Sequence, residues 1–463
     1  MMRIKKSKAF LPLLILGSAL IFISWGTPGK QPPGPSLEIP VQYYKLKNGL
    51  KVVLSPDKTA PTVAVGIYYN IGFRIEPKNR TGFAHLFEHM MFQGSQNLGK
   101  MEFVKLIQKN GGILNGSTRF DFTNYYEVVP SNTLKTILWA EADRMNGLAI
   151  NQGNLTNQQG VVKNEVKVNV LNQPYGGFPW LDMPQYANEN WYNAHNFYGD
   201  LADLDSAKLE DVHQFFSTYY APNNAVLVLV GDFEEKEAKD WIDQYFSSVS
   251  SAQLPAKPDV SEKRQEKEKK FTKEDKLANK PAIAVAYKMP ERNTPEYYAM
   301  GVIDQMLLQG QDSRLYQSLV QEKGYTSAVN GGINYLGNMF DYNGPMFWMA
   351  DLIYDAKIKP DSIIKQFDKA TAYIENKITQ QDLNLALVKF RSSLYDQLGS
   401  NFGLGKLDLL ASFALFDDNP AKINQLENEF KKITLPLLKK TAKEYLRSGN
   451  RTILIIDPKA TQP

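Results

Sequence analysis

The chain has 463 residues, of which 43% are hydrophobic and 22% charged, a composition typical of a folded globular protein with room for two domains. Its formal charge of +4 equals the four basic residues among the first eight, so the rest of the chain is neutral (4 minus 4), which argues against a nucleic-acid binder. The absence of cysteine excludes disulfides, thiolate zinc sites and cysteine nucleophiles.

The amino terminus has the layout of a targeting segment. A basic start runs into the apolar stretch 9–25, which predicts a secretory signal over residues 1–26, or a membrane anchor if the segment is retained. Either outcome places the body outside the cytoplasm, periplasmic or secreted, with inner-membrane anchoring as the alternative to cleavage. The Pro/Gly-rich residues up to 40 predict a tether, 27–40.

The body contains two similar units. Pro61–Tyr68 recurs as Pro281–Tyr287, an offset of 220 (281 minus 61), and Tyr220–Val230 resembles Tyr445–Ile456, an offset of 225 (445 minus 220). Two matches with nearly equal offsets indicate a duplicated domain.

Composition sets the expected boundaries of these units. We expect an N-terminal domain over 41–246 and a homologous C-terminal domain over 281–463. The segment between them, 247–280, is rich in Ser, Pro and alternating charge, which is typical of a linker.

Short β-branched runs precede longer helical patterns in the first unit. Residues 50–54 and 63–69 read as strands. Helical spacing of apolar residues predicts helices over 101–109, 134–145 and 207–219, the last with Ser206 as its N-cap. The mixture predicts an α+β fold, with two homologous domains that each pack helices on a largely antiparallel sheet.

One segment carries the chemistry: His85 and His89 flank Glu88 within an otherwise apolar helical pattern. Residues four apart share a helix face, so both imidazoles can reach one metal ion. Glu88 borders the same face and can act as the base that takes a proton from water. Buried histidines that only satisfy hydrogen bonds are the alternative, but ionisable groups on one buried face are costly without a cation.

A catalytic zinc ion takes three protein ligands and keeps one open position. The residues alone leave His195, His213 and Glu165 as candidates for the third ligand. Glu165 lies in a helical pattern that contains neither Pro nor Gly after Gly160, so its carboxylate could project inward from a second helix.

At these residues the sequence resembles the pitrilysin/insulinase family of inverted zincins, which use H-x-x-E-H. It looks most like the half-length bacterial branch related to mitochondrial processing peptidase. The resemblance runs from about residue 41 to residue 458, and its matching pieces include His85–His89, Gly111–Gly116, Asp121–Tyr126, Val161–Glu165, Asn172–Gly176, Tyr220–Asn224, Gly231–Phe233, Ser313–Tyr316 and Glu322–Gly324.

The resemblance implies one zinc ion per chain on His85, His89 and Glu165, with Glu88 as general base. It also implies that short or unfolded peptides bind as an added strand beside the site.

The substrate-side positions of this resemblance are Asn115, Thr123 and Tyr125. We expect the alternating stretch 118–128 to be an exposed edge strand that pairs with the peptide; a paired interior strand is the alternative.

The sequence departs from the family in two places. The Arg and Tyr that grip the substrate carbonyl in active members are replaced around Val320, Gln321 and Ser327, with Tyr325 two positions early. Gln158 stands where many relatives carry a second Glu, which would weaken the outer shell of the zinc site.

The chain is therefore expected to be a zinc metalloendopeptidase and the catalytic half of a heterodimer, whose homologous partner supplies the Arg/Tyr pair. A homodimer that uses Tyr325 is the main rival. A non-catalytic scaffold or peptide-holding subunit of the same fold is the alternative function.

Overall fold

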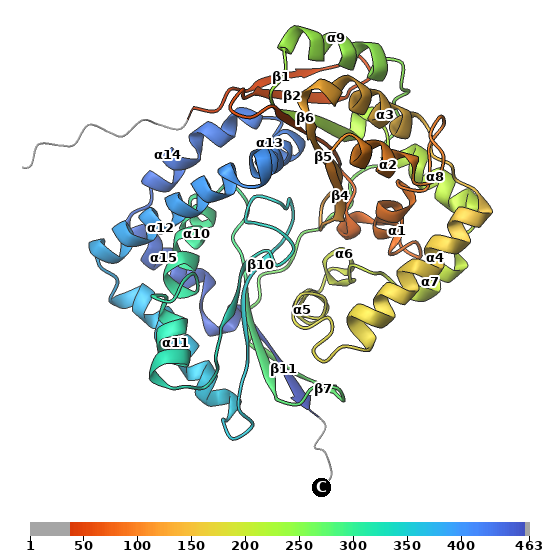
Figure 1. Cartoon of the computed structure of the whole chain (residues 1–463). Coiled ribbons are helices and arrows are strands. Elements are labelled where there is room, and N and C mark those ends of the chain that lie inside the picture. Colours follow the sequence, from red (N-terminus) through yellow and green to blue (C-terminus); the bar gives the residue numbers. More distant parts are fainter. Residues whose placement is uncertain (1–37, 459–463) are drawn as a thin grey trace, which may run out of the picture. The chain divides into compact units, whose positions relative to one another are not determined.

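The computed structural model describes residues 38–458, whose strands form two sheets (Figure 1). The first sheet has the order β1-β2-β6-β3-β5-β4, and only β2 and β6 run parallel. Its strands are β1 (Gln42–Lys45), β2 (Lys51–Pro56), β3 (Thr62–Tyr69), β4 (Ile113–Thr118), β5 (Thr123–Pro130) and β6 (Ala225–Gly231).

The second sheet repeats this plan. Its order is β7-β11-β8-β10-β9, and only β7 and β11 run parallel. This order matches β2-β6-β3-β5-β4 position by position, so the predicted duplication and the largely antiparallel α+β fold are confirmed. The strands are β7 (Lys269–Asp275), β8 (Ala282–Lys288), β9 (Asn330–Ile333), β10 (Phe347–Ile353) and β11 (Arg451–Pro458).

Helices surround both sheets. The helices predicted over 101–109 and 134–145 are present as α2 and α3. The α-helices are α1 (Phe83–Met90), α2 (Glu102–Lys109), α3 (Leu134–Asn146), α4 (Gln152–Val166), α5 (Met183–Ala187), α6 (Trp191–Ala194), α7 (Leu201–Ser206), α8 (Leu209–Tyr219), α9 (Glu235–Phe246), α10 (Pro295–Leu307), α11 (Pro360–Asn376), α12 (Gln380–Gly399), α13 (Leu404–Asp417), α14 (Leu426–Lys431) and α15 (Leu435–Tyr445).

The predicted N-cap of the third helix is wrong. Ser206 is the last residue of α7, and α8 begins only after Lys208. The side chain of Asp211 accepts a hydrogen bond from the backbone N–H of Lys208 at 2.9 Å. An acidic side chain in the first turn therefore caps this helix from inside, and a Ser two positions earlier is not needed.

The central strands of the first sheet are buried on both faces, which explains their nearly continuous apolar sequence. One face carries Val65 and Leu229, which belong to a core shared with α1, α3, α8 and α9. The other face is covered by α13, which comes from the second half of the chain. There the Leu407 side chain approaches Gly66 so closely that a Cβ on this glycine would lie 2.7 Å from it.

The first half in turn contributes a helix, α5, to the second sheet. Met183 and Ala187 of α5 pack against Ala284 and Leu454 of the second sheet. The expected domains 41–246 and 281–463 thus each lend a helix to the sheet of the other. Both halves consequently belong to a single structural unit that begins at Ile39.

The expected linker is shorter than 247–280, because residues 269–275 form β7 and pair with β11. Its side chains alternate between half-buried and exposed along the strand. The strand consists mostly of charged residues because it lies at the edge of the sheet, where charges discourage pairing with other chains, and this polarity makes it look like linker in the sequence.

The expected signal or anchor over 1–26, and the tether up to residue 37, lie outside the described residues. Between residues 38 and 458, no helix has the length and apolar character needed to cross a membrane.

Candidate metal centre

Helix α1 begins after Gly82, whose φ of 82° is readily adopted only by glycine. Apolar residues fix the helix in the core, because Phe83, Leu86 and Phe87 are fully buried beneath it. The opposite face of the same helix carries His85 and His89, in agreement with the four-residue spacing.

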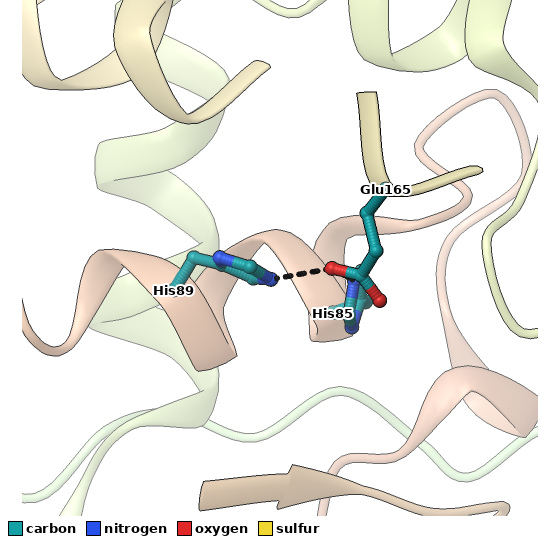
Figure 2. A group of neighbouring side chains, drawn as sticks. All are labelled: His85, His89 and Glu165. Carbon is teal, nitrogen blue, oxygen red and sulfur yellow. Dashed lines mark ion pairs between the residues drawn. The ribbon is translucent and has the colours of Figure 1, made fainter. Parts of the chain in front are cut away.

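Helix α4 brings Glu165 to these two histidines (Figure 2). One carboxylate oxygen, Oε2, lies 3.4 Å from Nε2 of His85 and 3.3 Å from Nε2 of His89. One ligand atom of each residue lies within 4.8 Å of the other two. The structure thus brings together the three residues that the sequence proposed as ligands.

The donor set fits a zinc ion. Both ring nitrogens of His85 are buried and have no hydrogen-bond partner among the described residues, which is costly unless another group binds them. Donor atoms around tetrahedral zinc are about 3.4 Å apart, because Zn–N and Zn–O bonds are about 2.0–2.2 Å long. The separations between Glu165 and the two imidazoles are close to this value.

Charge also favours a cation here. The nearby imidazoles of His85 and His89, at 3.4 and 3.3 Å, lower the pKa of Glu165 far below its usual range. Burial lowers the pKa of His85, but Glu165 and Glu88 outweigh that effect and raise it to about 9. Glu88 and Glu165 thus lie near the two ring nitrogens of His85, at 3.6 and 3.4 Å, and together they supply the negative charge that a divalent cation requires.

Glu88 is held at the edge of this group by a residue that the sequence analysis missed. Thr118 of β4 donates a hydrogen bond from Oγ1 to Oε2 of Glu88 at 2.8 Å. Burial raises the pKa of Glu88, but His85 and Thr118 reverse this and lower it overall, so the carboxylate is ionised and can accept a proton. The only sequence signal for Thr118 was its place in the alternating stretch.

Tyr198 is the second residue that was missed. Its hydroxyl donates to Oε1 of Glu165 at 3.1 Å, which leaves Oε2 directed at the two histidines. Tyr198 lies in an irregular segment after α6, and periodicity carries no signal there.

Comparisons with known proteins show the family to which the chain belongs. Residues 51–190 match the model of the insulinase family (peptidase family M16), and residues 206–388 match that of the peptidase M16 inactive domain. The chain belongs to the M16 family. The sequence resemblance is thereby confirmed, and the family's zinc proteases imply zinc as the metal.

The similar proteins include full-length matches. The chain is 24% identical to the zinc protease PqqE of Helicobacter pylori, over 89% of this chain and 92% of that protein. The crystal structure of a protease from H. pylori has a TM-score of 0.84 and 23% identity, covering 91% of this chain and all of that one. The periplasmic protease PqqL from Escherichia coli has a TM-score of 0.72 and 17% identity, with 91% of this chain covering 48% of it.

Two of the three predicted substrate-side positions, Thr123 and Tyr125, do not lie on an exposed edge strand as expected. Strand β5 pairs with both β3 and β4, so it is an interior strand, and Thr123 and Tyr125 are fully buried. Thr123 donates to the Ile71 carbonyl and Tyr125 to the Phe87 carbonyl. The stretch 118–128 was misread because alternation does not distinguish an edge strand from a paired neighbour.

The free edge of the sheet is β4 instead. Asn115 is exposed on this strand. Its neighbour Gly116 lies beside Glu88, where a Cβ would come within 3.3 Å of Glu88 Cγ. The edge that could accept an added strand thus passes directly beside the candidate base.

The other candidates lie away from the cluster. His213 is exposed on α8, and His195 is occupied by the carbonyls of Phe73 and Trp191. Gln158 is buried two turns before Glu165 on α4, and its amide donates to Asn157. Of the three candidates for the third ligand, the fold brings Glu165 to His85 and His89.

Proposed function

We propose that this M16 chain is a zinc metalloendopeptidase that hydrolyses short or unfolded peptides. The supporting observation is the convergence of His85, His89 and Glu165 on one point, with the ionised Glu88 at its edge. The three would hold one zinc ion, and Glu88 would be the general base. Tyr198 would orient Glu165. Gln158, two turns before Glu165 on α4, would belong to the outer shell of the zinc site.

Each residue has a distinct task in this reaction. The zinc ion, when bound, supplies a Lewis acid that polarises the scissile carbonyl and acidifies water. Glu88 accepts the proton from the attacking water, and the hydrogen bond from Thr118 fixes the direction of its carboxylate. The peptide would lie along β4, where unpaired backbone groups near Asn115 offer strand pairing.

We further propose that the chain works as the zinc-bearing half of a heterodimer. The expected Arg/Tyr positions hold Val320 or Gln321 and Ser327. Arg314 cannot replace the missing Arg, because its guanidinium stacks on Tyr373 at 3.6 Å and pairs with Asp382. A homologous partner would supply the missing donors that stabilise the oxyanion. PqqL, which spans about twice the matched length, is an example of two such halves in one chain.

The compartment is part of the same proposal. The basic and apolar start of the chain supports export, and the described structural neighbour PqqL is named as periplasmic. We propose an extracytoplasmic enzyme. Comparison of the mature protein's first residue with Met1 decides between signal cleavage and a retained anchor.

The test of the enzyme uses the protein purified from its native host with any companion chain. We expect one zinc ion per chain and cleavage of an internally quenched, unstructured peptide. Glu88→Gln should keep the zinc and lower the cleavage rate by about 10²–10⁴-fold, the usual contribution of a general base. Glu210→Gln, at an exposed glutamate of α8, is the matched control and should cleave normally. Cleavage by Glu88→Gln at the control rate would refute the assignment.

The same preparation tests the pairing. We expect a homologous companion chain without HxxEH but with the Arg/Tyr pair, and poor cleavage by this chain alone. An active homodimer, with Tyr325 in place of the missing Tyr, would refute the heterodimer.

A non-catalytic, peptide-holding subunit is the second candidate function, and the missing Arg/Tyr pair favours it. The ionised Glu88, held by Thr118, argues against it, because holding metal requires ligands but no base. Zinc without cleavage, even with the native companion present, would establish the scaffold instead.

A further inference from the structure

The segment that follows α6 is built directly onto the N-terminus of the metal-bearing helix α1. A Cβ on Gly199 would lie 2.3 Å from the Gly82 nitrogen, and a Cβ on Gly82 would lie 2.5 Å from the Tyr198 carbonyl oxygen. Both glycines also have positive φ, 66° and 82°. Backbone therefore packs on backbone here, without space for side chains, so a shift of one segment must move the other.

A buried carboxylate caps the same helix end. Glu76 is completely inaccessible to solvent, and it accepts hydrogen bonds from the backbone N–H groups of Gly82 at 2.9 Å and Ala84 at 2.6 Å. A negative charge at a helix N-terminus satisfies the free N–H groups and interacts favourably with the helix dipole. Glu76 thus fixes the first turn of α1, which contains His85.

His195 supplies the charge that balances this carboxylate. Its Nδ1 faces the Trp191 carbonyl at 3.1 Å, and its Nε2 contacts the Phe73 carbonyl and lies 3.6 Å from Oε2 of Glu76. Carbonyl oxygens only accept hydrogen bonds, so both ring nitrogens must carry hydrogen and the ring is an imidazolium. Burial lowers the pKa of His195, but Glu76 outweighs this and raises it. Burial also raises the pKa of Glu76, and the contact with His195 and the two backbone hydrogen bonds oppose that rise.

The segment 195–199 also touches the metal centre itself. The ring of Phe197 lies 4.7 Å from that of His85, and the hydroxyl of Tyr198 holds Glu165. One short segment thus contacts a candidate ligand on α1 and another on α4. At the α1 helix end it is anchored by the ion pair between His195 and Glu76.

We propose that His195 and Glu76 are positioning residues for the zinc site, whose ion pair docks segment 195–199 on α1 and so sets the spacing between the two histidines and Glu165. The proposal rests on the proposed zinc function and goes beyond it, since neither residue touches the metal or the peptide. Loss of the pair should alter the affinity and the geometry of the site, beyond any change in folding stability.

The experiment compares the full chain with His195→Gln, Glu76→Gln and His213→Gln, the last being the same change at an exposed histidine of α8. Zinc affinity is measured by competition with a chelator, and ligand geometry by the visible absorption of the Co²⁺-loaded protein. We expect both pair variants to bind zinc about 10–100-fold more weakly, as for other residues that orient metal ligands, with altered Co²⁺ bands. His213→Gln should match the wild type.

The two pair variants protect the test against misfolding. His195→Gln leaves a buried carboxylate without its cation, whereas Glu76→Gln is isosteric and keeps an oxygen for the backbone N–H groups. If the first does not fold, the second decides. The proposal is overturned if the folded variants bind zinc as His213→Gln does and differ only in their unfolding temperature. Failure of the zinc function itself looks different, because then the wild type binds no zinc or keeps it after His89→Gln.

Discussion

Five strands of each half have the same order, yet among residues 38–458 the candidate metal-binding group lies in the first half. In the first half, β3 is followed by α1, which directs His85 and His89 at Glu165. In the second half, β8 is followed by α10, whose buried carboxylate, Asp304, accepts a hydrogen bond from Nε1 of Trp348 at 2.7 Å.

The difference between these helices is whether their buried polar groups find partners inside the protein. Asp304 is satisfied by Trp348, so it needs no ligand. The ring nitrogens of His85 have no hydrogen-bond partner among the described residues. The duplicated fold therefore provides a frame, and a site arises only where buried donors and acceptors are left for something else to bind.

The largest expected effect comes from removing a candidate zinc ligand in the first half of the chain. His89→Gln should lower bound zinc and peptide cleavage at least about 10²-fold, because a carboxamide is a poor zinc ligand. Asp304→Asn, on the matching helix of the other half, should leave zinc content unchanged. Metal analysis of both dialysed proteins checks the pair. Equal zinc in the two variants would contradict the assignment of the site to the first half.

The next largest effect concerns the helix that the second half lends to the first. Leu407 of α13 is fully buried and packs on Gly66 of β3. Leu407→Ala should lower the free energy of unfolding by about 2–5 kcal/mol, as other buried Leu→Ala changes do. Urea unfolding measures this, with exposed Leu385→Ala of α12 as the control. If the two halves unfolded independently, two transitions would appear, and Leu407→Ala would shift only the transition of the second half.

The third prediction concerns the pH dependence of folding stability, which Asp304 of α10 should influence. Burial raises the pKa of Asp304 from 3.8 to about 6. The folded state therefore binds the proton more tightly than the unfolded state, and stability falls as the pH rises from about 4 to about 6. The change is at most about 3 kcal/mol, at 1.36 kcal/mol per pH unit.

Asp304→Asn removes this titration. Relative to the variant, the wild type should gain stability as the pH falls from about 7 to about 4. Urea midpoints of both proteins, measured with chelator present so that zinc release does not contribute, check the sign. A constant difference between the two across this range would contradict the raised pKa.

The smallest expected effect concerns Thr118, which contacts the proposed base Glu88. Thr118→Val keeps the shape of the side chain but loses the hydrogen bond to Glu88. A hydrogen bond to a charged group contributes about 1.5–3 kcal/mol, so kcat/KM should fall about 10- to 100-fold, at 1.36 kcal/mol per factor of ten, with zinc content intact. Thr133→Val, at a threonine that bonds the Pro130 carbonyl away from the site, should leave kcat/KM unchanged.

The features that were predictable from sequence depend on short-range spacing or on repetition of a pattern. The helical face of His85 and His89 follows from their four-residue spacing, and the duplicated fold follows from two repeated strand patterns. Alternation of residue types was less informative. It suggested an edge strand over 118–128, but the free edge is β4, because pairing depends on which strands are neighbours in space.

By itself, the sequence determined the α+β class, the internal duplication and the helix that bears His85, Glu88 and His89, because these depend on spacing within a few residues or on repetition. Only the tertiary structure decided that Glu165 meets the two histidines, that Thr118 and Tyr198 hold the two carboxylates, and that α5 and α13 are exchanged between the halves. These contacts join residues about 30 or more positions apart, and chain folding rather than local pattern sets such distances.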